Sequence, residues 1–121
     1  MPKLKNWKTE LTNIDSLYLC DILDKGTTLC FTVEDGNGIR YEVIFKNQGP
    51  YRVTDEQHLL SYWDEKKEKD IGWTFIVKNE TWSKDLELLD IYFPKATCYV
   101  IATYDCCLEI LTENEPKIRK M

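Results

Sequence analysis

Hydrophobic and polar residues alternate along three consecutive stretches in the first half of the chain. These stretches are SLYLCDIL (16–23), TLCFTVE (28–34) and IRYEVIF (39–45). Such alternation is typical of β-strands that bury one face. Turn-forming residues separate the stretches at 24–26 and 36–38. The pattern therefore predicts a three-stranded antiparallel meander.

Loops of three residues predict a definite register for this meander. The facing pairs would be Leu17 with Val33, Leu19 with Phe31, Val33 with Tyr41, Phe31 with Val43, Leu29 with Phe45, and Glu34 with Arg40. A slip by one residue would put Phe31 beside Glu42, so the three-residue loops are favoured. The same loops place Cys20 directly across from Cys30, as a bridge or as a packed thiol pair.

The remaining patterns predict helices and further strands. A short helix or turn is expected over 6–14, a strand over 51–53, a helix from the capping box at Thr54–Gln57 to about Lys69, a strand over 72–77, a helix over 84–93 and a hairpin of strands 96–104 and 107–113. Over 84–93 a strand pattern competes, and helix is favoured. The fold class predicted is α+β, a single domain (1–121) whose mostly antiparallel sheet carries two main helices on one face.

The charge of the chain is uneven. The chain has 16 Lys and Arg against 21 Asp and Glu. Six of the basic residues lie at the ends: Lys3, Lys5, Lys8, Lys117, Arg119 and Lys120. Without them, residues 9–116 carry 10 basic against 21 acidic side chains, a net charge of −11. Such a body repels nucleic acid and anionic lipid and attracts a basic partner. The basic ends are interpreted as solubilising tails.

The five cysteines indicate a reduced protein rather than a metal site. An odd number, with no N-terminal signal segment, predicts free thiols in the cytoplasm. The spacings do not match the Cys-x₂₋₄-Cys pairs of zinc sites. In a strand, Cys106 and Cys107 point to opposite faces. We expect Cys106 in the core with Leu108 and Ile110, and Cys107 on a mixed face where reagents reach it more easily.

No residue pattern identifies a reaction. His58 is the only histidine, and its neighbouring acids are explained by helix capping. The stretch DGNG (35–38) resembles the start of a calcium-binding loop, but Ile39 and Lys46 occupy ligand positions, so a hairpin turn explains it better. Nucleotide-binding and hydrolase motifs are not found in the sequence. We therefore predict no catalytic, cofactor-binding or metal-binding residues.

Four acids on the second predicted helix and just before it form a candidate contact surface. They are Glu80, Asp85, Glu87 and Asp90. One interpretation is a solvated, solubilising surface, as for most acids. The other is an acidic epitope that binds a partner, with some of the Tyr and Trp residues exposed beside it as anchors.

Several segments resemble a known class of proteins. They are YRVTDEQHLLSYW (51–63), GWTF (72–75) and CLEILTENEP (107–116), with Trp7 and Leu11 near the start. Together they resemble small cytosolic bacterial proteins that are encoded beside polymorphic or contact-dependent toxins and are regarded as immunity proteins. The resemblance implies a non-catalytic protein that binds and neutralises a cognate toxin, and it maps no functional residue. A basic toxin would fit the acidic body.

Two other functions stay open. One is a small-ligand or structural subunit module, which requires an apolar pocket with a few convergent polar groups. The other is an enzyme that uses carboxylates and a tyrosine, which requires acids converging in a cleft.

Overall fold

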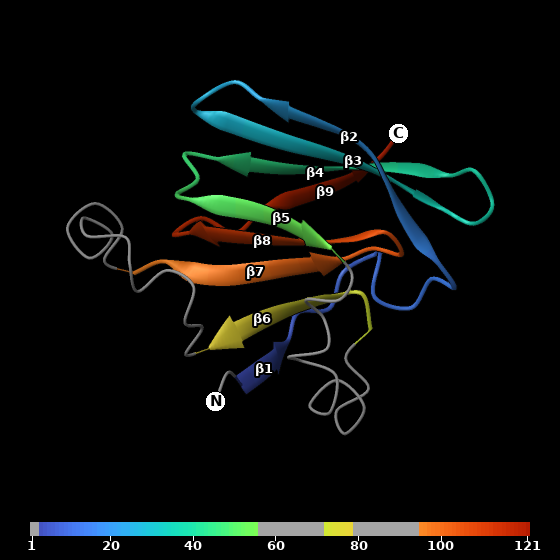
Figure 1. The fold of residues 1–121 in the computed structure, drawn as a ribbon, viewed down its shortest axis with the longest axis horizontal. Coiled ribbons are helices and arrows are strands. Elements are labelled where there is room, and N and C mark those ends of the chain that lie inside the picture. Colours follow the sequence, from blue (N-terminus) through green and yellow to red (C-terminus); the bar gives the residue numbers. More distant parts are fainter. Residues whose placement is uncertain (1–2, 56–71, 79–94) are drawn as a thin grey trace.

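The computed structural model describes residues 3–55, 72–78 and 95–121. These residues form nine β-strands (Figure 1). The strands are β1 (Lys3–Asn6), β2 (Leu17–Asp24), β3 (Thr28–Asp35), β4 (Arg40–Lys46), β5 (Tyr51–Asp55), β6 (Thr74–Lys78), β7 (Thr97–Ala102), β8 (Cys106–Thr112) and β9 (Lys117–Lys120).

The strands form two antiparallel sheets that share one core. One sheet has the order β1-β6-β7-β8-β5 and the other β2-β3-β4-β9. Aromatic rings join the sheets across the core: Phe45 lies 6.5 Å from Tyr99 and Phe31 lies 6.2 Å from Tyr51, between ring centroids. These rings stand at inward positions of alternating strands. The apolar side chains of the alternating pattern therefore fill the space between the two sheets.

The predicted α+β class is wrong. The described residues form an all-β fold and contain no helix. Thr54 and Asp55, predicted to begin a helix, instead end β5, where they pair with Cys107 and Cys106. The rest of that helix and the predicted helix over 84–93 lie outside the described residues. Within the described part of the chain, no helix is long and apolar enough to cross a membrane.

The leading segment over 6–14 contains a strand end and a turn rather than a helix. Asn6 ends β1, and the Thr12 N–H donates to the Thr9 carbonyl at 3.2 Å. Of the two alternatives predicted here, helix or turn, the turn is therefore observed.

The predicted register between β3 and β4 is confirmed. Val33 pairs with Tyr41, and Glu34 pairs with Arg40, whose side chains form an ion pair of 3.3 Å. The three-residue loop 36–38 closes this hairpin, with Gly38 at a φ of +84° that favours glycine. Asp35 Oδ1 accepts hydrogen bonds from the backbone N–H groups of residues 37 and 39, at 2.8 and 3.0 Å. The DGNG stretch is thus a hairpin turn.

The predicted register between β2 and β3 is wrong. Leu19 pairs with Val33, and the register shifts at a β-bulge between Leu19 and Asp21. The hairpin closes at a tighter turn, where the Lys25 N–H donates to the Thr28 carbonyl at 2.8 Å. Cys20 therefore sits in the bulge, exposed, and does not face Cys30. All five cysteines are free.

The basic ends of the chain are edge strands rather than tails. β1, with Lys3 and Lys5, forms one edge of the five-stranded sheet, and β9, KIRK, forms one edge of the four-stranded sheet. With these strands included, the described residues carry 12 basic and 12 acidic side chains. The net charge of −5 therefore belongs to the sequence of residues 56–71 and 79–94.

The five-stranded sheet is buried on both faces. Tyr99, Ile101, Leu108 and Ile110 face the shared core, while a second apolar cluster on the other face includes Phe75, Val100 and Cys107. The predicted faces of the adjacent cysteines are therefore confirmed. The predicted accessibility is wrong: Cys107 is fully buried, and Cys106, at the strand end, is half-buried.

Candidate interaction surface

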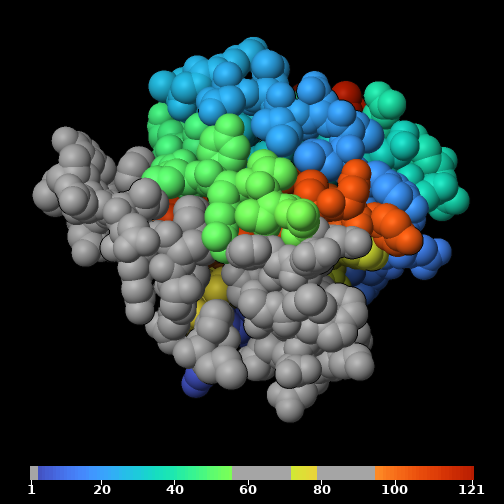
Figure 2. Space-filling view, in the orientation of Figure 1, coloured from blue at the N-terminus to red at the C-terminus, as the bar shows by residue number. Residues whose placement is uncertain are grey.

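On one side of the fold, an edge strand of one sheet lies next to an edge strand of the other. β2 is the last strand of one sheet and β5 the last strand of the other. The Tyr51 hydroxyl on β5 donates to Asp24 Oδ2 on β2 at 2.9 Å, which joins the two edges. In Figure 2 the green atoms of β5 lie beside the blue atoms of β2 and the orange atoms of the β7–β8 hairpin. These three elements form one continuous side of the surface.

Each of these three elements carries an exposed hydrophobic side chain. Among the described residues, the large exposed hydrophobic side chains are Tyr18, Leu23, Val53, Tyr104 and Met121, and all but Met121 lie on β2, β5 or the β7–β8 turn. Tyr18 is 37% exposed and Tyr104 is 61% exposed, and their ring centroids lie 5.5 Å apart. We call the surface formed by Tyr18, Leu23, Val53 and Tyr104 the β2–β5 rim.

Local structure fixes the two tyrosines in place. Tyr18 lies between the inward-facing Leu17 and Leu19, so strand alternation turns it outward. Tyr104 lies in the tight β7–β8 turn, which the Thr103 hydroxyl closes by accepting the Cys106 N–H at 3.0 Å. The Tyr104 N–H then donates to the Leu17 carbonyl at 2.6 Å, which ties the turn to β2. The aromatic pair therefore rests on rigid backbone.

Exposed carboxylates lie close to the residues of the β2–β5 rim along the chain. They are those of Asp15, Asp21, Asp24, Asp55 and Asp105. Two arginines of neighbouring strands are engaged in ion pairs: Arg52 with the buried Glu109, with both N···O distances at 3.1 Å, and Arg40 with Glu34 at 3.3 Å. Lys25, in the β2–β3 turn, is the neighbouring exposed cation. An aromatic surface with this excess of carboxylates attracts cationic groups.

Cys106 and Cys107, in and beside the β7–β8 turn, are not activated nucleophiles. Burial, reinforced by the Glu109 carboxylate, strongly raises the pKa of Cys107, and burial raises the pKa of Cys106. A thiol with a raised pKa stays protonated at neutral pH and reacts slowly. Among the described residues, no group of His, Cys, Asp and Glu could hold a metal ion. His58 lies outside those residues.

The structure locates a surface that sequence reasoning missed. The predicted contact acids Glu80, Asp85, Glu87 and Asp90 lie in 79–94, outside the described residues. A signal for the rim was present, because Tyr18 is an aromatic residue at an outward position of an alternating strand. Its proximity to Tyr104 depends on how the two sheets pack, which the local pattern does not specify.

No protein-family model, no curated protein and no solved structure matches this chain.

Proposed function

We propose that this chain is a non-catalytic interaction module that binds a basic protein partner through the β2–β5 rim. The observation that carries this proposal is the exposed Tyr18–Tyr104 pair, together with five exposed aspartates close to the rim along the chain. Tyrosine is enriched at protein interfaces because it buries a large surface at low entropic cost. These carboxylates accelerate encounter with a basic partner and disfavour acidic ones.

The partner we propose is a protein toxin, which makes this chain an immunity protein of the cytoplasm. The support is the resemblance of the segments over 51–63, 72–75 and 107–116 to immunity proteins, together with five free thiols. The negative net charge of 56–71 and 79–94 adds to the attraction that the rim exerts on a basic toxin. Inhibition then follows from occluding the surface of the toxin that binds its substrate.

A co-expression experiment tests this function. The toxin encoded beside the gene is expressed in bacteria with this chain, without it, and with an unrelated acidic protein of similar size. We expect growth to be rescued only by this chain, and the two proteins to purify together. If the toxin kills equally in all three strains and no complex is recovered, the immunity proposal is wrong.

A small-ligand module is the second candidate, and a surface hollow beside Trp7 favours it. The hollow has a volume of about 480 Å³, within the size range of ligand sites. Its lining mixes apolar with charged residues, whereas small-ligand sites are mostly apolar. The interaction module is therefore the better-supported function.

A further inference from the structure

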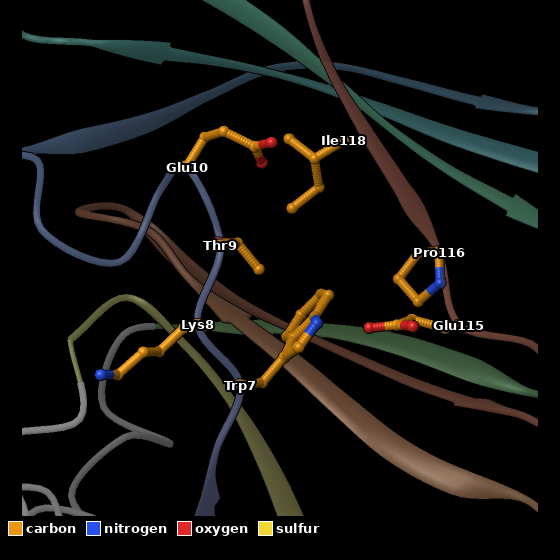
Figure 3. A pocket seen from close by; sticks show the side chains of 7 residues that line it. All are labelled: Trp7, Lys8, Thr9, Glu10, Glu115, Pro116 and Ile118. Carbon is orange, nitrogen blue, oxygen red and sulfur yellow. The ribbon is translucent and has the colours of Figure 1, made fainter.

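The hollow beside Trp7 lies on the side of the fold opposite the β2–β5 rim. It forms between residues 7–10, which follow β1, and residues 115–118, which lead into β9 (Figure 3). β9 and β2 are the two opposite edges of the four-stranded sheet. The hollow and the rim are therefore separate surfaces. The hollow is lined by Trp7, Lys8, Thr9, Glu10, Glu115, Pro116 and Ile118.

A hydrogen-bond donor opens into this hollow. The Trp7 side chain is only 8% exposed, and its ring packs edge-on against Tyr99 at 4.9 Å. Among the residues that the structure describes, no acceptor pairs with the Trp7 indole N–H. The indole of Trp73, in contrast, donates to the Ile14 carbonyl at 2.7 Å. The Trp7 indole N–H therefore reaches the hollow and is available to an acceptor that enters it.

Two carboxylates and an aromatic ring make the hollow favourable for a cation. Glu10 and Glu115 reach it from different chain segments, and the Glu115 carboxylate points toward the indole (Figure 3). Burial raises the pKa of Tyr99 in the core, and the negative charge of Glu115 raises this pKa further. The Lys8 side chain points away from the hollow.

The cations of β9 lie on its other face or further along the strand. Lys117 and Arg119 pair with the outward Ile44 and Glu42, so they sit on the opposite face of β9 from Ile118. Arg119 is also engaged with Glu42 at 3.0 Å. The two glutamates therefore dominate the charge inside the hollow.

We propose that the Trp7 hollow binds a lysine or arginine residue of an extended peptide segment. The cationic group lies between the carboxylates of Glu10 and Glu115 and against the indole face. A backbone carbonyl of the same segment accepts the Trp7 indole N–H. Pro116 and Ile118 contact the methylene stem of the side chain, which carries apolar surface behind its charge. This site does not depend on the proposed immunity function.

Nuclear magnetic resonance of the full, ¹⁵N-labelled chain tests the site. The indole cross-peak of Trp7 is assigned with Trp7→Phe. The chain is then titrated with Ac-Gly-Lys-Gly-NH₂, with its arginine analogue and with its norleucine analogue, which keeps the stem but lacks the charge. We expect the two cationic peptides to shift the Trp7 peak with a Kd of about 1 mM, as suits a few solvent-exposed contacts. The norleucine peptide should shift it much less.

Charge-neutral variants provide the matched comparison. Glu10→Gln with Glu115→Gln removes both carboxylates and should weaken binding about three- to tenfold, the sum of two exposed ion pairs. Glu34→Gln with Glu113→Gln removes the same charge from residues that neither line the hollow nor belong to the β2–β5 rim, and should change binding less than twofold. All four side chains reach solvent, so the fold is retained.

Three results would overturn the proposal. The first is no shift of the Trp7 peak with any peptide. The second is an equal shift with the norleucine peptide, which indicates apolar contact alone. The third is equal weakening in both double variants, which indicates only the bulk charge of the chain. Because no toxin is used, these outcomes are independent of the co-expression experiment.

Discussion

The ion pair between Arg52 and Glu109 gives the sharpest prediction about stability. Glu109 lies on the outward face of the five-stranded sheet with its side chain fully buried, while 29% of the Arg52 side chain remains exposed. Two N···O distances of 3.1 Å join the guanidinium to the carboxylate. Removing one partner of such a pair leaves a buried charge, which costs about 3–5 kcal/mol.

We expect Arg52→Met to lower the free energy of unfolding by about 3 kcal/mol, the lower end of that range, because Arg52 is partly exposed. Glu109→Met should lower the free energy of unfolding by about 2 kcal/mol, since the remaining guanidinium is partly exposed and stays hydrated. The free energy of unfolding of the double variant should fall by no more than that of Arg52→Met alone. The coupling energy between the two residues is then about 2 kcal/mol.

Urea unfolding of the four proteins, followed by circular dichroism, measures this cycle. Arg40→Met is the control, because it removes an ion pair with Glu34 whose arginine is 56% exposed, and should cost less than about 0.5 kcal/mol. If Arg52→Met costs no more than Arg40→Met, or if the two single effects simply add, Glu109 is not buried against Arg52 as described.

Two further predictions concern thiols and turns. A maleimide reagent should label Cys106 slowly in the folded protein, at a rate that still rises above pH 9 because the pKa of this thiol is raised. The same reagent should label Cys107 only when the protein unfolds. Mass spectrometry measures both rates, and faster labelling of Cys107 than of Cys106 would contradict the burial of both faces of the sheet. Gly72→Ala should cost about 3 kcal/mol, because its φ is +81° and a methyl there collides with the Thr12 carbonyl. Gly26→Ala has a similar φ but open space, so it should cost only about 1 kcal/mol, and equal thermal unfolding temperatures for the two variants would refute the collision.

The parts of the fold that local chemistry determines could be predicted. The β3–β4 hairpin follows from alternation and from a three-residue turn with Gly38, so its register was right. The β2–β3 register failed because a bulge at Cys20 inserts a residue that alternation does not reveal. β1 and β9 were missed because KLKN and KIRK are short and charged, and only pairing with a neighbouring strand makes them strands.

The sequence does contain a sign that both faces of the five-stranded sheet are buried, although the prediction of alternating faces passed over it. TCYVIA and CCLEILT are nearly continuous apolar runs, which indicate strands covered on both faces. The prediction that Cys107 is accessible assumed that one face of this sheet is exposed to solvent, and it was therefore wrong. The capping-box residues Thr54 and Asp55 show the opposite case, where a local helix signal loses to pairing with β8.

The affinity of the rim for its partner tests the central claim most directly. Calorimetry would compare the natural chain, the double variant Tyr18→Ser with Tyr104→Ser, and Met121→Ser, using the toxin encoded beside the gene. Met121 is as exposed as Tyr104 but lies off the rim, and all three side chains lie at the surface. We predict that the double variant binds at least about 30-fold more weakly, the loss of about 2 kcal/mol expected for aromatic anchors, while Met121→Ser binds normally. Equal affinities for all three proteins would contradict the assignment of the β2–β5 rim as the binding surface.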